Sequence, residues 1–403
     1  MNVPPSIDLL GARTPELAAR LERWCGLNSG SGHAAGLERM RAALRAAYAA
    51  SFPAARIEEP PADAPGHNPP GVRALRVRLR PEAPLQVLLN GHYDTVYEAA
   101  DPFQAGRWLD ERRLNAPGAA DMKGGLVAMH AALEAFEATP GAERLGWEVL
   151  LTPDEETGSH GSVALLEDAA RRHRLGLVFE PARPNGDAVR SRKGTGELRA
   201  TCHGRAAHAA KIPNDGRNAI LALGEFLLAA AKLPEEMEGV VVNVGLVRGG
   251  GPATNVVPDF AEAVLDIRTT RMADRQPLLD RLAALAAPIN AREGLRLELA
   301  GGFNRPPKEC RPEEEAAFAE WRRAARDVGV APFDWVHAGG GSDGNLLHAA
   351  GLPNLDGIGP VGDHMHSDRE VCDVSTVSAR AQVAALFLHR LATGEVALPA
   401  RPA

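Results

Sequence analysis

Apolar residues follow two different patterns along the chain, and the pattern changes near residue 194. Before that point, short apolar runs such as LQVLLN (85–90), WEVLLT (147–152) and LGLVFE (175–180) alternate with helical patterns such as GGLVAMHAALEAF. Such runs are typical of strands buried on both faces, so their alternation with helices predicts a mostly parallel sheet between helical layers. The spacing of Leu17, Leu21 and Trp24 predicts an amphipathic first helix with Thr14 as its N-cap.

From residue 194, the segments GELRATCHG, VVVNVGLV and AEAVLDIR alternate apolar with polar residues. This alternation predicts strands with one solvated face, and a helix over DRQPLLDRLAALAAPINA follows them. The glycines and prolines of GGFNRPPKE predict a linker, after which the earlier pattern returns. We therefore expect an α/β domain formed by residues 1–193 and 305–403, with an inserted α+β domain over residues 194–304.

Length and composition narrow the class of protein. A chain of 403 residues is longer than one hydrophobic core usually serves. A net charge of −7 and 4% aromatic residues exclude the basic, aromatic surface of a nucleic-acid-binding protein. Four widely spaced cysteines without a CxxC pair argue against thiolate zinc binding and against a disulfide framework. Because the N-terminal residues lack a signal-peptide pattern and no apolar run would cross a bilayer, we expect a cytoplasmic protein without membrane contact.

Histidine and carboxylate residues follow the predicted strands. His92 and Asp94 follow LQVLLN, Glu155 and Glu156 follow WEVLLT, and Glu180 ends LGLVFE. In open parallel sheets, ligands bind at the carboxyl ends of the strands, so these side chains are expected at one edge. The His92–Asp94 pair alone is more typical of a solvated turn, and single carboxylates there are usually surface charges. Together, however, the carboxylates would repel each other without a shared cation, which predicts a metal site.

Two further segments carry candidate ligands. Asp121 in APGAADMKGG precedes a predicted helix, where a lone aspartate is more often a cap. The order of residues there is not that of a P-loop, so phosphate binding is not indicated. DHMHSDREV contributes His364 and His366, and their spacing alone does not choose between one ligand and two.

An ordered set of short motifs runs through the chain: GHYDTV, APGAADMKGG, DEETGS, FEP, GRAAHA, NVVP, GGGSDG and HSDRE. This order and rough spacing resemble those of the M20 family of zinc peptidases, in particular its glutamate carboxypeptidase branch. The resemblance extends from the first predicted helix to the last. It implies a zinc-peptidase-like domain, with an inserted domain that acts as a lid and as the contact of a homodimer.

The resemblance also implies two zinc ions per chain, with Co²⁺ or Mn²⁺ as substitutes. The implied metal ligands are His92, Asp121, Glu156, Glu180 and His366. Asp121 would lie between the two ions, and Asp94 would orient the ring of His92. His366 is preferred to His364 because HSDRE matches the family's histidine followed four positions later by a glutamate, here Glu370.

Glu155 would be the general base. Two zinc ions about 3.5–4 Å apart share a carboxylate and a water, and they lower the pKa of that water toward about 7. Glu155 would then take the proton of the water and return it to the leaving amine.

In the family, three residues of the inserted domain match positions that face the substrate: His208, Asn255 and Arg268. Arg305 matches a family arginine at the junction of the two domains. In dimeric relatives, the matching histidine and asparagine reach the partner's active site. Arg268 shares a strand face with Glu262 and Asp266, so an ordinary salt-bridged face is a serious alternative. Arg305 suits a terminal carboxylate, but it could also be a linker residue.

The motifs predict a hydrolase that releases a C-terminal, glutamate-like amino acid from a peptide or an N-acyl amino acid. An amidohydrolase of the aminoacylase or acetylornithine-deacetylase type would use the same metal chemistry, and the metal motifs do not separate the two. A dimeric binding protein without catalysis is a third hypothesis. It is disfavoured because every implied ligand and the base are present.

Overall fold

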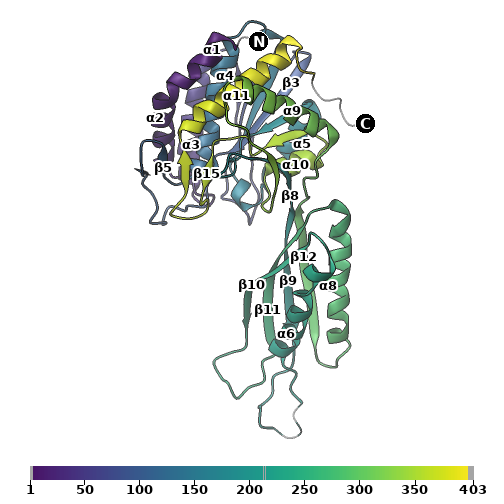
Figure 1. The fold of residues 1–403 in the computed structure, drawn as a ribbon. Coiled ribbons are helices and arrows are strands. Elements are labelled where there is room, and N and C mark those ends of the chain that lie inside the picture. The colour runs from purple at the N-terminus through teal and green to yellow at the C-terminus, as the bar shows by residue number, and fades with distance from the viewer. Residues whose placement is uncertain (1–2, 212, 214, 398–403) are drawn as a thin grey trace. The chain divides into compact units, whose positions relative to one another are not determined.

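The computed structural model describes residues 3–211, 213 and 215–397. Its contacts divide the chain into two compact units (Figure 1). The large unit comprises Met1–Ser191, Cys310–Ala338 and Ser342–Ala403, and the small unit comprises Arg192–Glu309 and Gly339–Gly341. The inserted domain predicted over residues 194–304 lies within the small unit.

A mixed sheet forms the centre of the large unit, with strand order β1-β2-β6-β3-β7-β14-β8-β13. Strands β6, β3, β7 and β14 are parallel, whereas β2 and β1 continue the sheet in antiparallel pairs. The strands are β1 (Arg56–Glu58), β2 (Leu75–Leu79), β3 (Leu85–His92), β6 (Leu145–Thr152), β7 (Leu175–Val178), β8 (Ala188–Arg192), β13 (Trp335–Ala338) and β14 (Asn354–Asp356). The apolar runs predicted as buried strands are β3, β6 and β7.

Helices cover both faces of this sheet. Successive side chains of a strand point to opposite sides, so a strand that is apolar throughout needs a helical layer on each face. Val87 and Leu89 of β3 join the core formed with α2, α3, α4, α9 and α11, whereas Leu88 packs with α5 and α10. The helices are α1 (Pro5–Asp8), α2 (Thr14–Cys25), α3 (Ala34–Ser51), α4 (Gly125–Glu137), α5 (Val163–Arg172), α9 (Pro312–Asp327), α10 (Asp343–Ala349) and α11 (Ser375–Thr393). Short helical turns are η1 (Leu9–Arg13), η2 (Ala119–Gly124), η3 (Ala142–Arg144) and η4 (Glu155–Thr157). The predicted α/β fold is confirmed.

A second, smaller sheet of the large unit has the order β15-β16-β5-β4. Its strands are β4 (Arg107–Trp108), β5 (Arg113–Asn115), β15 (Gly362–Asp363) and β16 (Val371–Asp373). Val371 of β16 pairs with Asn115 of β5 in antiparallel register. This pairing joins two segments that are far apart in the sequence, and the loop between β15 and β16 carries His366.

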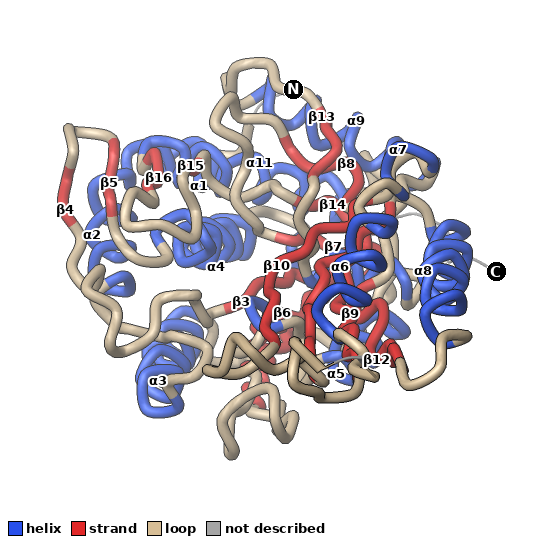
Figure 2. Tube along the Cα trace, turned by 90° about the horizontal axis from the view of Figure 1, so that it is seen from below, coloured by secondary structure: helices blue, strands red, loops and turns tan. Residues whose placement is uncertain are grey.

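The small unit is an antiparallel sheet with the order β10-β11-β9-β12 and helices on one face (Figures 1 and 2). Leu198, Ala200 and Cys202 alternate along β9 and are buried with Leu223 of α6 and Leu282 of α8. Its elements are β9 (Gly194–His203), α6 (Ala219–Ala230), α7 (Leu233–Glu236), β10 (Val241–Gly249), β11 (Phe260–Thr269), η5 (Met272–Asp274), α8 (Arg275–Asn290) and β12 (Arg296–Arg305). One covered face is what the alternating sequence pattern predicts.

Two expectations about segment ends are wrong. The turn η1 leads directly into α2, so Arg13 is the N-cap and Thr14 is already helical; the Thr14 hydroxyl donates to the carbonyl of Gly11 at 2.9 Å. GGFNRPPKE is not a linker throughout, because β12 continues to Arg305 by pairing with β9.

The cysteines form no disulfide: Cys25, Cys202 and Cys372 are buried, and Cys310 is half-buried. Within the part of the chain that the structure describes, no helix has the length and apolar character needed to cross a bilayer.

Candidate metal centre and active site

Parallel strands of the large unit bring several predicted site residues to one edge of the sheet. His92 is the last residue of β3 and pairs with Thr152, the last residue of β6. Glu155 and Glu156 follow in η4, and Glu180 lies just beyond β7. The histidine and the carboxylates therefore lie at the carboxyl ends of neighbouring strands, where open α/β sheets bind ligands.

The first cluster of candidate metal ligands comprises His92, Asp121 and Glu180. His92 Nε2 lies 3.1 Å from Asp121 Oδ1 and 3.6 Å from Glu180 Oε1. Burial acts to lower the pKa of His92, but hydrogen bonds with Asp121 and Asp94 outweigh it and raise this pKa well above its ordinary value. One imidazole nitrogen and two carboxylates in mutual contact are a donor set that suits a divalent ion.

The second cluster comprises Asp121, Glu156 and His366. His366 Nε2 lies 3.3 Å from Asp121 Oδ2 and 3.2 Å from Glu156 Oε2. Burial and the charge of Asp121 raise the pKa of Glu156 to about 8. The other oxygen of Glu156, Oε1, is buried and has no hydrogen-bond partner among the described residues. A cation would compensate this buried carboxylate, so the residues present fit a metal ion.

Asp121 belongs to both clusters, since its two oxygens face the two histidines. Burial acts to raise the pKa of Asp121, but hydrogen bonds with His366 and His92 outweigh it and lower this pKa well below its usual range. The neighbouring His364 belongs to neither cluster of described residues, and its Nε2 lies 3.7 Å from Asp363. The arrangement therefore offers two adjoining cation positions with one carboxylate in common.

Asp94 connects the first cluster to the loop that carries the paired glutamates. Its Oδ1 accepts the backbone N–H of Glu155 and lies 3.3 Å from His92 Nδ1. Its Oδ2 accepts the backbone N–H of Glu156 at 3.1 Å and the hydroxyl of Ser31 at 2.8 Å. Because Asp94 is fully buried, these contacts fix both the imidazole ring and the start of η4.

Glu370 has a role that sequence reasoning missed. Its carboxylate accepts the backbone N–H groups of Gly118, Ala120 and Asp121 at 2.8–3.1 Å. Burial raises the pKa of Glu370 to about 7. Glu370 thus holds the backbone that carries Asp121. The HSDRE motif contains this glutamate, but nothing in the sequence indicates that its partners lie some 250 residues away.

Asp343 of the GGGSDG motif supports the other loop. It accepts the hydroxyl of Ser159 at 2.5 Å and that of Thr152 at 2.7 Å, so it joins α10 to the end of β6 and to the DEETGS turn. These contacts come from the side chain of Asp343 and not from the glycines of the motif.

The four remaining candidates belong to the small unit. His208 and Asn255 are exposed and adjacent, because Ala209 N–H donates to the carbonyl of Asn255 at 2.9 Å. Arg268 binds Asp266 Oδ2 at 3.0 Å and the carbonyl of Gly339 at 2.9 Å, so the salt bridge considered from the sequence is present. Arg305 is buried at the end of β12.

An α/β fold with two adjoining histidine–carboxylate clusters beside the strand ends of its main sheet is suited to the chemistry of a metallohydrolase. The sequence profile described as "Peptidase family M20/M25/M40" matches residues 88–390. The chain belongs to this family, and the resemblance noted from its motifs is confirmed.

The chain is similar to several curated relatives with different names. Carboxypeptidase G2 of Pseudomonas sp. (strain RS-16) is 25% identical over 315 residues, covering 77% of this chain and 74% of that protein. Succinyl-diaminopimelate desuccinylase 2 of Shewanella loihica is 29% identical over 307 residues, covering 68% and 78%. Acetylornithine deacetylase of Myxococcus xanthus is 36% identical over 200 residues, covering 45% and 48%. These names agree on a hydrolase of this family and differ in substrate.

Solved structures share the fold. Aminopeptidase PepT of Bacillus cereus has a TM-score of 0.77 at 19% identity, covering 94% of this chain and 99% of that chain. The YXEP protein of Bacillus subtilis, described as a dinuclear metal binding peptidase from the M20 family, has a TM-score of 0.67 at 14% identity, covering 94% and 99%.

Proposed function

We propose that the protein is a two-metal hydrolase that cleaves an amide bond and releases a C-terminal, glutamate-like amino acid from a peptide or an N-acyl amino acid. The observation that carries the proposal is the position of Asp121 between His92 and His366, at 3.1 and 3.3 Å. A carboxylate that faces two imidazoles, each with a further carboxylate beside it, is suited to bridging two divalent ions.

We assign His92 and Glu180 to one ion, Glu156 and His366 to the other, and Asp121 to both. Nitrogen and carboxylate donors favour Zn²⁺, and Co²⁺ or Mn²⁺ would bind as substitutes. Such a pair of ions supplies an activated water and polarises the carbonyl that the water attacks.

Glu155 is the proposed general base. It is buried and adjoins Glu156, and its backbone N–H is held by Asp94 at 3.1 Å. Its carboxylate would take a proton from the attacking water and transfer it to the leaving nitrogen. Asp94 acts on this step by positioning, because it orients the His92 ring and the backbone of η4.

In the small unit, Arg305 and Arg268 are the proposed contacts for the terminal carboxylate of the substrate, since guanidinium groups bind carboxylates bidentately. Similarity to the desuccinylase and the deacetylase favours a second candidate, an amidohydrolase acting on N-acyl amino acids. Rates on α- and γ-glutamyl peptides, compared with rates on N-acetyl amino acids, decide between the two. Much faster turnover of the acetyl substrates would refute the carboxypeptidase assignment.

A matched pair of variants tests the site. Glu156→Gln should lower the metal content from about two ions per chain to about one, because it removes a ligand. Glu155→Gln should retain about two ions but lose about 10²–10⁴-fold in kcat, the usual contribution of a general base. Metal analysis of the purified variants and steady-state kinetics measure both effects. Full activity in Glu155→Gln would contradict its role as base.

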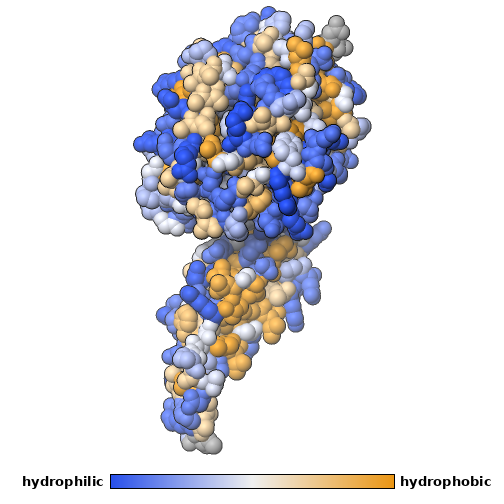
Figure 3. Space-filling view, turned by 90° about the vertical axis from the view of Figure 1, so that its left-hand side faces the viewer, coloured by the Kyte–Doolittle hydropathy of each residue, from blue (hydrophilic) through white to orange (hydrophobic). Residues whose placement is uncertain are grey.

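We also propose that the protein is a homodimer through the small unit. Leu221 and Leu228 lie two turns apart on α6 and are 66% and 73% exposed, and β10 is an edge strand with Leu246 and Val247 exposed. Figure 3 displays hydrophobic residues gathered on the face of this unit that is turned toward the viewer. A second copy of the chain would cover such a surface.

A further inference from the structure

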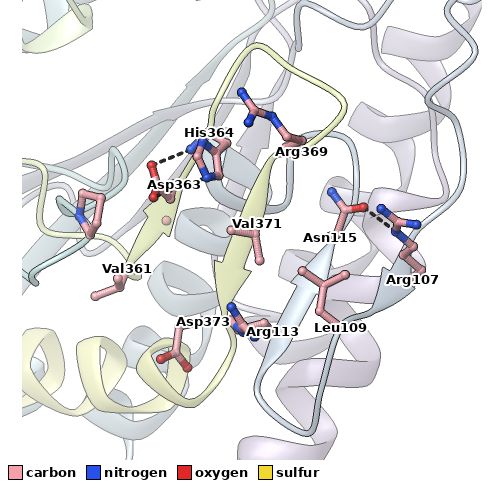
Figure 4. A pocket seen from close by; sticks show the side chains of 12 residues that line it. Arg107, Leu109, Arg113, Asn115, Val361, Asp363, His364, Arg369, Val371 and Asp373 are labelled. Atoms are coloured by element: carbon pink, nitrogen blue, oxygen red, sulfur yellow. Dashed lines mark hydrogen bonds and ion pairs between the residues drawn. The ribbon is translucent and has the colours of Figure 1, made fainter.

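A cavity of about 440 Å³ lies on the second sheet of the large unit (Figure 4). Most of its lining comes from the β4–β5 hairpin, from β15 and β16, and from the loop between them, and Pro184 and Val361 complete it. Small-molecule sites commonly have volumes of about 300–1,000 Å³, so the cavity is large enough for a metabolite. Neither the assigned metal ligands nor the proposed substrate contacts line it.

Positive side chains outnumber negative ones in this cavity, with Arg107, Arg113 and Arg369 against Asp363 and Asp373. Both carboxylates already have partners. Asp373 accepts hydrogen bonds from Arg112 Nη2 and Ser375 Oγ, each at 2.6 Å, and Asp363 accepts the backbone N–H of His364 at 2.7 Å.

The arginines are less fully engaged than the carboxylates. Arg107 Nε donates a hydrogen bond to Asn115 Oδ1 at 2.9 Å, and Arg113 Nε donates one to Asp110 Oδ2 at 2.6 Å. The exposed guanidinium of Arg369 has no hydrogen bond or ion pair with any described residue. Guanidinium N–H groups therefore remain available to an anion.

The lining between the charges is apolar. Val361, Val371 and Leu109 contribute to the cavity, and Figure 4 displays Arg369 and Arg113 on opposite sides of Val371. A ligand that matches this pattern has an anionic group at each end and a short aliphatic segment between them. We propose that the cavity is an accessory binding site for a small aliphatic dicarboxylate, with Arg369 and Arg113 as the two anchors.

The proposed site adjoins the metal centre through one short loop. Arg369 and His366 lie on the same loop, which is fastened by hydrogen bonds from Ser367 Oγ to the carbonyl of His364 at 2.7 Å and from Tyr97 to the carbonyl of Ser367 at 2.8 Å. A dicarboxylate held between Arg369 and Arg113 would tie this loop to β5. The ligand should therefore raise the affinity of the ion assigned to His366, a consequence that rests on the proposed function.

Direct binding tests the site. Calorimetric titration of glutarate into the metal-loaded protein should give a Kd below about 1 mM, which weakens about tenfold or more in Arg113→Ala and in Arg369→Ala because each loses a charge-assisted anchor. Arg369→Lys should keep part of the affinity, because it keeps the charge. Arg45→Ala, which removes an arginine that is 57% exposed on α3, should leave the Kd unchanged. Thermal melts of each variant check that it is folded.

Three results would overturn the proposal. The first is that the wild-type protein does not bind glutarate, the second is that the Kd of Arg113→Ala and of Arg369→Ala equals that of the wild type, and the third is that inorganic phosphate binds more tightly than glutarate. Unchanged binding in these variants would mean that the two arginines do not anchor glutarate. Tighter binding of phosphate would contradict the need for an aliphatic segment.

Metal titration measures the coupling without relying on catalysis. Saturating glutarate should raise the affinity for the second ion about fivefold, at the lower end of typical linkage, and should have no effect in Arg369→Ala. An unchanged affinity in the wild-type protein would refute the coupling. Glutarate binding without any hydrolytic activity would refute the proposed function but leave the site intact.

Discussion

At the scale of single residues, the assigned metal centre depends on side chains that are not ligands themselves. Glu370 accepts three backbone N–H groups around Asp121, and Asp94 accepts two at the start of η4. Each buried carboxylate therefore fixes the segment that carries a candidate ligand. Such supporting groups commonly change metal affinity by about 10–100-fold when they are removed.

Glu370→Gln provides a test of this support. The amide cannot accept all three backbone N–H groups, because its –NH₂ would face at least one of them. We expect a loss of about 1–3 kcal/mol in the free energy of unfolding and a loss of about tenfold or more in metal affinity. Denaturant unfolding of the apo protein and competition with a chromogenic chelator measure these effects.

Asp368→Asn is the matched control, because it removes an exposed carboxylate from the same loop and keeps the backbone carbonyl that Asn115 binds. It should leave both quantities unchanged. Wild-type metal affinity in Glu370→Gln would contradict a positioning role for Glu370.

At the scale of elements, the sequence predicts those site residues that lie at the end of a strand, because an apolar run marks the strand itself. His92 follows one apolar run and Glu180 ends another, so the pattern predicts that both residues lie at one edge of a sheet. Ser31 and Glu370 give no such signal, because each meets its partner across more than 60 positions of the chain. The end of β12 also depends on a distant partner. Glycines and prolines favour a loop locally, but pairing with β9 extends the strand to Arg305.

The proposed dimer contact is also a property of elements. Replacing Leu221 and Leu228 together by Glu places charges on the exposed apolar stripe of α6, which should convert a dimer into a monomer because charges are costly in a buried interface. Light scattering coupled to size-exclusion chromatography measures the mass. Leu9→Glu is the control, since Leu9 is 63% exposed but belongs to the large unit. An unchanged mass in the double variant would exclude α6 from the contact.

At the scale of the whole molecule, the candidate residues are divided between two units. All assigned metal ligands and Glu155 belong to the large unit, whereas His208, Asn255, Arg268 and Arg305 belong to the small one. His208 and Asn255 are exposed on paired loops. If the dimer brings these loops to the partner's metal centre, each active site contains residues of both chains.

Complementation between two inactive chains tests this arrangement. A His208→Ala chain keeps its metal centre, and a Glu155→Gln chain keeps its His208. In co-expressed protein, about half of randomly assorted dimers are hybrid, and each hybrid has one complete site if His208 acts across the interface, so activity should recover to about a quarter of the wild-type value. Steady-state kinetics of the mixture, compared with each variant alone, measures the recovery.

The control is a mixture of Glu155→Gln and Glu156→Gln chains. Both substitutions lie in the large unit, in the same η4 turn, so every site of a hybrid dimer carries one of the two defects whichever chain supplies His208. This mixture should stay inactive. Recovery in the first mixture but not in the second would therefore arise from exchange of His208 alone. No recovery in the first mixture, with hybrid dimers demonstrated by two affinity tags, would mean that each chain completes its own site.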